Sequence, residues 1–392
     1  MGSKFKCFLI GLFFLNLAAI GQNNSDFHSV DSLTYKYYLE GDWEHLISAG
    51  TEGIQNGIDY KFLRQRLGFA FYSKGNYYQA SRHFEKALSF DSYDSFTLTY
   101  LYYSYLYCGQ TESAVFITGK MPEDLRKKLS VKLFQPIESI ELEYNFKYAA
   151  SGLRSNPQYF HIGVNSNIGS KLALYQMFSD YKQSIKIQQF KQNENVRDLQ
   201  PEYFALLKYS LSPHFMIMTA YHYLHPTSNI ITSSANLGFL ELSSDFGRMN
   251  FRINASVLKS SSYSVVQSGI KTGVLFSGSL NAYSISSLSM TSRQSITHFI
   301  FDQKAGFKIF KSGWIEGSVT AGDMTYYNDH EAMYIYNLID ATTFRTGVTL
   351  FIYAGKHITI WTNYSYERKE YFENSQYHYN QFSYLGGIKW KL

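Results

Sequence analysis

Residues 139–148 read Ser-Ile-Glu-Leu-Glu-Tyr-Asn-Phe-Lys-Tyr, with an apolar or aromatic residue at every second position. Because successive side chains of a β-strand point to opposite faces, this stretch predicts a strand with one apolar and one polar face. The same alternation recurs from Ile137 to the C-terminus, most clearly at Met249–Val257 and Ile358–Tyr366. We therefore expect this part of the chain to be an antiparallel β-structure with two distinct faces.

Short turn sequences divide this region at intervals that fit one strand up and one strand down. The predicted turns are Ile168-Gly169-Ser170, Ser212-Pro213, Asp245-Phe246-Gly247, Ser277-Gly278, Ser312-Gly313 and Ala354-Gly355. Together with the two chain ends they predict about fourteen strands. Longer polar stretches at Gln188–Pro201 and Tyr326–Tyr334 are expected to be loops on the opposite rim. A soluble β-sandwich would need Greek-key connections, whereas this up-and-down order favours a closed transmembrane β-barrel over residues 137–392.

The composition agrees with a membrane-facing β-structure. Aromatic residues make up 18% of the chain, with Tyr 35 and Phe 31, and tyrosine suits an interface that is apolar at one end and wet at the other. Lys+Arg 36 nearly balances Asp+Glu 31, which argues against a nucleic-acid binder. The mean hydropathy of −0.24 excludes a helical membrane protein.

The N-terminus reads as a removable signal peptide over residues 1–21. Lys4 and Lys6 precede an apolar run from Cys7 to Ile20, and Ala19-Ile20-Gly21 offers small residues for cleavage before Gln22. An N-terminal membrane anchor is the alternative reading. Cleavage would leave Cys108 as the single cysteine, so no intramolecular disulfide is expected.

Residues 22–121 carry an internal repeat. Gly41, Gly75 and Gly109 are separated by 34 residues, and each is expected at the turn between two helices. The middle copy has small residues at Gly68 and Ala80 and large ones around them: Leu67, Phe71, Tyr77 and Phe84. This pattern resembles the tetratricopeptide repeat, a helix–turn–helix unit. Residues 122–136 are expected to form a capping helix and a linker.

In the tetratricopeptide-repeat family the first helix of each repeat lines a concave groove that receives a partner. Carried onto this chain, the resemblance implies an aromatic and largely uncharged groove without the Lys/Arg clamp that grips peptide carboxylates. An apolar peptide or sugar rings would suit such a groove, and packing of the rings on each other or on the barrel is the alternative. The implied groove residues are Tyr35, Tyr38, Phe62, Gln65, Phe69, Tyr72, Phe96, Thr99 and Tyr103.

The polar faces of the predicted strands should line the barrel lumen. Only some strand positions can be assigned to the inner face from the sequence, and these carry eight cations and four carboxylates. This count predicts a mildly positive interior that favours anionic or neutral solutes. The predicted lumen residues are Glu141, Glu143, Lys147, Lys208, Arg252, Lys271, Asp302, Lys304, Lys308, Glu316, Arg345 and Lys389.

We find no catalytic motif and expect no enzymatic activity, cofactor or metal site. His161, His214, His222 and His357 are interpreted as polar residues of the lumen or the interfaces. The polar cluster Asn328-Asp329-His330-Glu331 is expected to be a solvated loop tip, although it offers ligands that a divalent cation could use.

The last strand resembles the C-terminal signal by which bacterial outer-membrane barrels are recognised for insertion, carried here by Phe382, Tyr384, Trp390 and Leu392, with Leu in place of the usual Phe. The domain order resembles polysaccharide exporters, surface-lipoprotein assembly modulators and small repeat-preceded barrels of unknown role. These resemblances imply an outer-membrane location in a Gram-negative bacterium, with the repeats in the periplasm and lipid around the barrel. A transport or export pore whose repeats recruit a periplasmic protein or an exported polymer is the leading hypothesis. A non-conducting assembly or scaffold protein is the alternative.

Overall fold

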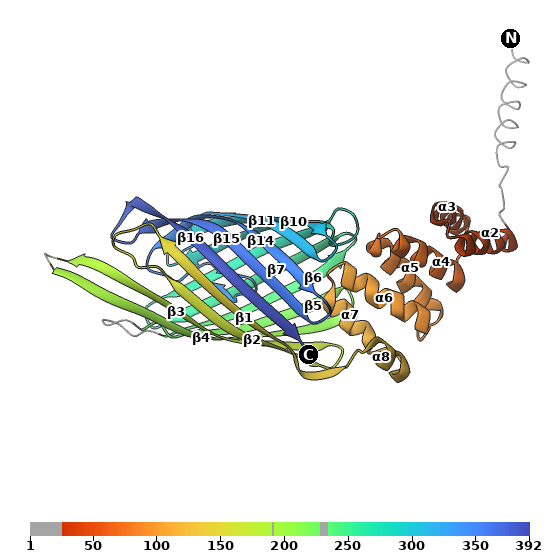
Figure 1. The fold of residues 1–392 in the computed structure, drawn as a ribbon, viewed down its shortest axis with the longest axis horizontal. Coiled ribbons are helices and arrows are strands. Elements are labelled where there is room, and N and C mark those ends of the chain that lie inside the picture. Colours follow the sequence, from red (N-terminus) through yellow and green to blue (C-terminus); the bar gives the residue numbers. More distant parts are fainter. Residues whose placement is uncertain (1–25, 190–191, 228–233) are drawn as a thin grey trace, which may run out of the picture.

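The structure, a computed structural model, describes residues 26–189, 192–227 and 234–392. The predicted signal peptide lies outside the described residues. The described chain has two parts: a stack of helices and a barrel whose tilted strands start beside the last helix (Figure 1).

Seven helices precede the barrel in the described part of the chain. Their bounds are α2 Phe27–Glu40, α3 Trp43–Gln55, α4 Lys61–Ser73, α5 Tyr77–Phe90, α6 Ser95–Tyr107, α7 Thr111–Thr118 and α8 Glu123–Leu129. Gly41, Gly75 and Gly109 all have positive φ, at 70°, 75° and 74°, and each stands at the predicted turn between two helices. In the first two turns the glycine is followed by an N-cap, since Asp42 and Asn76 accept hydrogen bonds from His45 N and Gln79 N. The glycine spacing therefore predicted these turns correctly.

Close packing of α4 on α5 depends on Gly68. A Cβ atom built on this glycine would lie 2.7 Å from Phe84 Cε1, so the Phe84 ring occupies the space that any side chain would need. Phe84 is fully buried in an apolar cluster with Ala80, Leu98 and Leu101. The small residue and the large ring thus form one interlocking pair, as the middle repeat predicted.

We predict that Gly68→Val destabilises the helical domain by about 1–3 kcal/mol, the usual cost of overpacking a filled core. Thermal unfolding of the full chain in detergent, followed by circular dichroism at 222 nm, measures the effect. Gly152→Val is the matched control, because no atom lies within 4 Å of a Cβ at Gly152. An unchanged helical transition in Gly68→Val would contradict the prediction.

Fourteen strands close into one antiparallel barrel in the described chain. The barrel strands are β1 Phe134–Ala149, β2 Gln158–Ile168, β3 Leu172–Gln189, β4 Gln192–Ser212, β5 Phe215–Leu224, β6 Ala235–Phe246, β7 Met249–Ser260, β8 Ser264–Leu275, β9 Ala282–Arg293, β10 Ile296–Phe310, β11 Gly313–Ala321, β14 Ala341–Ala354, β15 Ile358–Tyr371 and β16 Asn374–Lys391. Each strand pairs with its sequence neighbours in the barrel, and β16 closes the barrel on β1 from Ser139↔Lys391 to Ala149↔Gln381. The predicted fold class and strand number are confirmed. β1 begins at Phe134, slightly before the expected Ile137.

Alternation along the strands separates an apolar exterior from a polar interior. On β1, Leu142, Tyr144 and Tyr148 are exposed on the outside, while Glu143 and Asn145 are buried inside. Large apolar side chains likewise cover the outside of the other strands, which is the surface that a bilayer requires. Among the described residues, no helix is long and apolar enough to span a membrane.

The six predicted turns all lie at the rim next to the helices, which also holds both ends of the barrel. The two longer polar stretches, Gln188–Pro201 and Tyr326–Tyr334, differ from the loops that the sequence predicted. β3 and β4 continue as a paired hairpin up to Gln189↔Gln192, so most of Gln188–Pro201 is strand. Tyr326–Tyr334 belongs to the connection between β11 and β14 at the far rim, as predicted, but it does not extend into solvent. It folds into the barrel, where side chains of many strands bind it.

Candidate functional site: the barrel lumen and its helical cover

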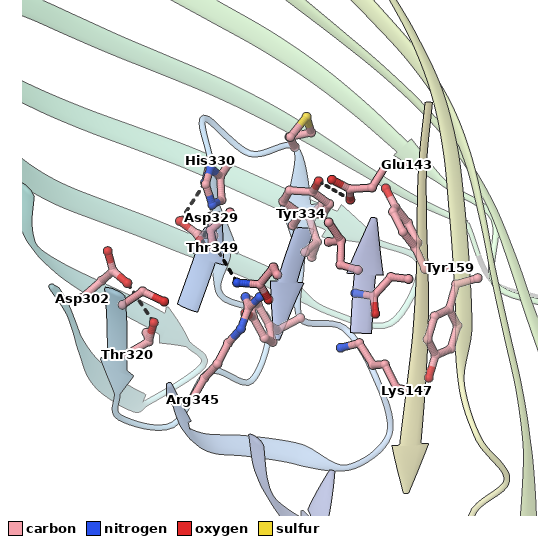
Figure 2. A pocket seen from close by; sticks show the side chains of 18 of the residues that line it. Glu143, Lys147, Tyr159, Asp302, Thr320, Asp329, His330, Tyr334, Arg345 and Thr349 are labelled. Carbon is pink, nitrogen blue, oxygen red and sulfur yellow. Dashed lines mark hydrogen bonds and ion pairs between the residues drawn. The ribbon is translucent and has the colours of Figure 1, made fainter. Parts of the chain in front are cut away.

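A small hairpin occupies the lumen between β11 and β14. Its strands β12 Asn328–Asp329 and β13 Tyr334–Ile335 pair only with each other (Figure 2). Met324 and Ala332 on this loop are fully buried. Asn328-Asp329-His330-Glu331 is therefore not a solvated loop tip, because the inner barrel wall surrounds it. No group of three or more metal-ligating side chains is found among the described residues.

Polar side chains of the wall hold the hairpin. Asn328 exchanges three hydrogen bonds of 2.9 Å with Gln267, and its Nδ2 donates to Ser256 Oγ at 2.8 Å. Glu331 at the hairpin tip forms ion pairs of 3.1 Å with Arg252 and 3.3 Å with Lys271. These bonds come from β7 and β8, so they fix the tip against one side of the barrel.

The same side of the wall is apolar where the hairpin lies on it. Inward side chains of β3 to β8, including Met177, Phe204, Met218 and Leu237, form a buried cluster with Ala332 of the hairpin. Met333 and Ile335 of the hairpin pack against this cluster. The strand pattern did not predict an apolar inner wall, because the lumen was expected to be polar all round.

The hairpin tip adopts an unusual backbone. His330, Glu331 and Ala332 have φ of 49°, 55° and 68°, a left-handed conformation that costs energy for residues with a Cβ atom. His222 Nδ1 lies 2.8 Å from the Ala332 carbonyl oxygen and helps to hold this turn. The surrounding wall therefore maintains a conformation that the tip sequence does not favour by itself.

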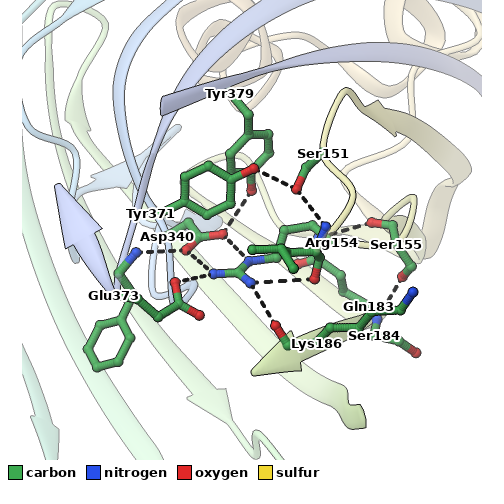
Figure 3. Close-up of polar contacts among 12 residues, drawn as sticks. Ser151, Arg154, Ser155, Gln183, Ser184, Lys186, Asp340, Tyr371, Glu373 and Tyr379 are labelled. Carbon is green, nitrogen blue, oxygen red and sulfur yellow. Dashed lines mark hydrogen bonds and ion pairs between the residues drawn. The ribbon is translucent and has the colours of Figure 1, made fainter. Parts of the chain in front are cut away.

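At the rim far from the helices, Arg154 ties the end of this loop to two others (Figure 3). Its guanidinium donates to both carboxylate oxygens of Asp340 at 2.6 and 2.9 Å and to Glu373 at 2.7 Å. Asp340 also accepts from Tyr379 Oη at 2.9 Å. This buried cluster joins the β1–β2 connection, the loop before β14 and the β15–β16 turn.

Two cavities remain in the lumen, one on each side of the hairpin tip. The first, about 300 Å³, extends toward the far rim and includes Lys147, Tyr334 and Trp361 in its lining (Figure 2). The second, about 590 Å³, lies at the helix end and includes Glu112 of α7. The two cavities meet where they share lining residues, which are Asp302, Lys304, Glu316, Asp329, His330 and Phe351.

The predicted lumen residues all lie on strand positions with the inward parity. Glu143, Lys147 and Arg345 line the first cavity, Arg252 and Lys271 the second, and Asp302, Lys304 and Glu316 both. Glu141 and Lys389 lie side by side across the β1–β16 seam, 4.0 Å apart. Lys208 reaches Glu112 on α7, and Lys308 lies over the Trp314 ring at the helix end.

The predicted ratio of eight cations to four carboxylates does not hold, because the incomplete register missed several carboxylates and the cation Lys369. Lys147 pairs with Glu367 at 2.9 Å, and the two cations Arg252 and Lys271 share Glu331. The alternating pattern of β15 could have identified Glu367 and Lys369 as inward-facing residues. The register could not have found Glu331, because that carboxylate comes from a loop. The further inward carboxylates on the strands include Glu202, Glu241, Asp245 and Glu367.

The predicted groove residues of the helical domain fall into three groups. Tyr35 and Phe62 are exposed, and Thr99 and Tyr103 are half-buried. A cluster of ring contacts in the helical domain joins Tyr38, Phe69, Tyr72 and Phe96 to one another and to Tyr100. Gln65 does not line a groove, because it is buried and donates to Asp94 at 2.7 Å and Thr97 at 2.8 Å.

The helical domain is docked on the barrel through three of the short turns. Tyr78 N donates to the Gly278 carbonyl at 2.9 Å, and Leu280 N donates to the Tyr107 carbonyl at 3.0 Å. Lys171 at the β2–β3 turn lies over the Phe116 ring of α7. At the β4–β5 turn, His214 Nε2 lies 3.1 Å from Glu85 Oε2 on α5. The sequence offered no sign of this interface, since its partners lie more than fifty residues apart in the chain.

The four residues of the predicted insertion signal lie on the closing strand or just after it. Tyr384, Trp390 and Leu392 are exposed on the barrel exterior, and Phe382 stacks on Tyr148 of β1. Leu392 N donates to the Glu138 carbonyl at 2.9 Å, so the pairing with β1 extends to the last residue. The insertion signal itself stays a prediction.

Comparison with solved structures finds several bacterial barrels of low similarity. The chain is similar to a bacterial polysaccharide outer membrane secretin, with 10% identity, 66% of this chain and 99% of the other covered, and a TM-score of 0.41. It is similar to the Pseudomonas putida toluene transporter TodX, with 6% identity, 65% and 89% covered, and a TM-score of 0.45. It is also similar to the translocator domain of the autotransporter NalP from Neisseria meningitidis, with 7% identity, 74% of this chain and 99% of the other covered, and a TM-score of 0.35. No family model and no curated protein matches the chain. Such low values support no statement about a cargo or a partner.

The closed barrel and its apolar exterior indicate the general class of this protein. The chain is an outer-membrane β-barrel protein with a helical domain before the barrel.

We predict that docking of the helical domain weakens as the pH rises above neutral. The Glu85 carboxylate raises the pKa of His214, although partial burial opposes this, and Asp245, Arg82 and the Tyr105 ring also face the imidazole. A raised pKa in the docked state means that the pair contributes fully below the ordinary pKa of 6.5 and is lost as the pH passes the raised value.

Hydrogen–deuterium exchange of the α5 and β4–β5 peptides between pH 6 and 9, corrected for intrinsic rates, measures this effect. His214→Gln should abolish the pH-dependent part. His357→Gln is the matched control, because that histidine contacts the Lys391 carbonyl on another turn. Equal pH dependence in all three proteins would refute the prediction.

We predict that Gly278→Val undocks the helical domain and exposes Cys108. A Cβ atom at Gly278 would clash with the Asn76 side chain. Burial raises the pKa of the Cys108 thiol to about 12, and its Sγ lies 3.6 Å from the Gly278 carbonyl, so the docked thiol should react slowly. Alkylation of Cys108, followed by peptide mass mapping, should become about tenfold faster for each 1.4 kcal/mol lost.

Gly355→Val controls for backbone strain in this experiment. Gly355 has φ of 72° in the β14–β15 turn, and no atom lies within 4 Å of its Cβ position. Alkylation of Cys108 should be unchanged in this variant. A similar acceleration in both variants would show that general destabilisation, rather than undocking, exposes the thiol.

Proposed function

We propose that this chain is an outer-membrane pore of transport or export type, whose lumen is narrowed by the inward hairpin. The observation that carries the proposal is the pair of cavities that meet beside the hairpin tip. Charged, amide and hydroxyl side chains line both cavities, and such a lining lowers the cost of passage for a hydrophilic solute.

We place the helical domain in the periplasm. The first and last strands start and end at the same rim as α8, and that rim carries the predicted short turns. Bacterial outer-membrane barrels have their short turns on the periplasmic side. The signal-peptide pattern at residues 1–21 supports export across the inner membrane.

In this proposal the hairpin acts as the gate of the pore. Its tip is held in a left-handed turn by ion pairs of Glu331 with Arg252 and Lys271. Each left-handed residue with a Cβ atom costs about 1 kcal/mol or more, so a released tip would gain by relaxing. Loss of the ion pairs would also leave two cations facing each other without their shared carboxylate.

The helical domain would receive a periplasmic partner, either a protein or an exported polymer. The glycine spacing and the Gly68–Phe84 packing support the resemblance to tetratricopeptide repeats, and Tyr35 and Phe62 leave aromatic surface exposed. The second cavity lies directly beneath α7, so a partner held on the helices would be close to the entrance of the lumen.

The alternative is a non-conducting assembly or scaffold protein that acts through its helices. The apolar cluster beneath the hairpin favours it, because Ala332, Met333 and Ile335 hold the loop on the wall in addition to its polar bonds. We propose no catalytic role in either case.

We predict that Glu331→Gln increases the conductance of the purified full chain in planar bilayers. The neutral amide removes the charge that neutralises Arg252 and Lys271, so the hairpin should leave the lumen more often, with an increase of about tenfold in open time per 1.4 kcal/mol lost. A second variant, with residues 326–336 replaced by a short Gly/Ser linker, should conduct continuously.

Glu138→Gln is the matched control. Glu138 pairs with Lys391 at the helix-end rim, 3.0 Å away, and lies far from the hairpin. It should conduct like the unaltered chain. If neither Glu331→Gln nor the loop replacement passes current, the pore is refuted and the scaffold alternative is favoured.

A further inference from the structure

A row of aromatic side chains crosses the inner wall, and two of its three members line the cavities, whereas Lys308 lies over the ring of the third, Trp314. Trp314 on β11 is the register partner of Phe351 on β14, and Phe351 is the partner of Trp361 on β15. These positions share the inward parity of Glu316, Arg345 and Thr349. Phe351 lines both cavities and Trp361 the first. We call Trp314, Phe351 and Trp361 the aromatic row.

The end of the row lies flat on the barrel wall because its neighbour is a glycine. Trp361 is the register partner of Gly387 on β16, and a Cβ atom at Gly387 would clash with the Trp361 indole. Gly387 therefore provides the space that lets one face of the indole lie on the strand. Trp361 Nε1 donates to Glu143 Oε2 at 2.9 Å, which fixes the ring in that orientation. The opposite face is left toward the cavity that Trp361 lines.

Hydrogen-bonding groups occupy the next inward row of the same strands. Glu316 on β11 is the partner of Thr349 on β14, and Thr349 is the partner of Asn363 on β15. All three line the first cavity. Asn363 Nδ2 donates to Thr349 Oγ1 at 2.8 Å, but Asn363 Oδ1 is buried without a hydrogen-bond partner. The polar row thus contributes a carboxylate, a hydroxyl and an amide side chain to the lining of the first cavity.

From this arrangement we infer that the wall formed by β11, β14 and β15 is a binding site for an uncharged oligosaccharide. Sugar rings have apolar C–H faces that pack on flat aromatic rings, and hydroxyl edges that need amide, hydroxyl and carboxylate partners. The aromatic row and the polar row beside it offer both kinds of group on adjacent positions. The inference rests on the proposed function insofar as it takes the oligosaccharide to be the cargo of the pore.

The charges around the site argue against a strongly ionic ligand. Of the lumen cations nearest to this wall, Lys147 pairs with Glu367 at 2.9 Å, and Arg345 donates to Tyr336 Oη at 2.7 Å. Glu316 accepts from Tyr283 Oη at 2.6 Å, so its position is fixed by a neutral donor. The two cations beside the polar row are thus engaged within the barrel, and the charged groups Asp302, Lys304 and Glu316 also line the cavity.

Isothermal titration calorimetry of the full chain in detergent tests the site. The probes are uncharged hexasaccharides of glucose, mannose and N-acetylglucosamine, with tetramethylammonium as a probe for simple cation–π binding. At least one hexasaccharide should bind, and Trp361→Ala should weaken it by about tenfold or more. Trp361→Phe keeps a flat ring and should retain most of the affinity. Asn363→Leu should also weaken binding, because it removes the amide group from the polar row.

Phe299→Ala is the matched control, since this aromatic side chain is 63% exposed on the barrel exterior. It should bind like the unaltered chain, and heat-modifiable electrophoretic mobility should verify that every variant is folded. Binding of no hexasaccharide overturns the inference, as does binding that Trp361→Ala and Asn363→Leu leave unchanged. Binding of tetramethylammonium alone would replace it with a cation site. Saccharide binding without conductance would support the site and refute the pore, so the two failures are distinguishable.

Discussion

Closure of the barrel by β16 on β1 is the constraint on which the rest of the structure depends. In a bilayer every backbone N–H and C=O group needs a partner within the protein, and only a closed sheet leaves no edge. The seam runs from Ser139↔Lys391 to Ala149↔Gln381, and Leu392 N continues it to Glu138. Because the seam joins the first strand to the last, both ends of the barrel lie at one rim. The helices that precede β1 must then lie at that rim too.

The closed wall also creates the environment that positions the inward hairpin. One side of the lumen is apolar at Met177, Phe204 and Leu237, and the hairpin covers it. Gln267 forms a hydrogen bond with the hairpin backbone, and Arg252 and Lys271 form ion pairs with its tip carboxylate. These polar groups of the hairpin therefore have partners inside the barrel. The two cavities remain on either side of the hairpin tip, and β11, β14 and β15 contribute to their lining. The aromatic row is on these strands, and its Phe351 lines both cavities.

The helical domain and the barrel depend on each other at their interface. Glycines with positive φ serve both parts: Gly75 and Gly109 turn the chain between helices, and Gly278 brings a barrel turn against Asn76 and Tyr78. Glu112 on α7 forms an ion pair with Lys208 inside the rim of the barrel at 2.6 Å. The helices are therefore part of the wall of the second cavity. A partner that moves them would change the entrance of the lumen directly.

The sequence by itself determined the elements and their faces. Period-two alternation placed Glu143, Lys147 and Arg345 inside the barrel, and the glycine spacing placed the turns at Gly41, Gly75 and Gly109, because each signal reflects local geometry. Only the tertiary structure decided that residues 326–334 fold inward, that Glu331 neutralises two cations, and that Trp314, Phe351 and Trp361 stand in one row. These facts depend on strand register and on contacts between segments far apart in the chain. A one-residue shift of register would undo them without changing the alternation that the sequence displays.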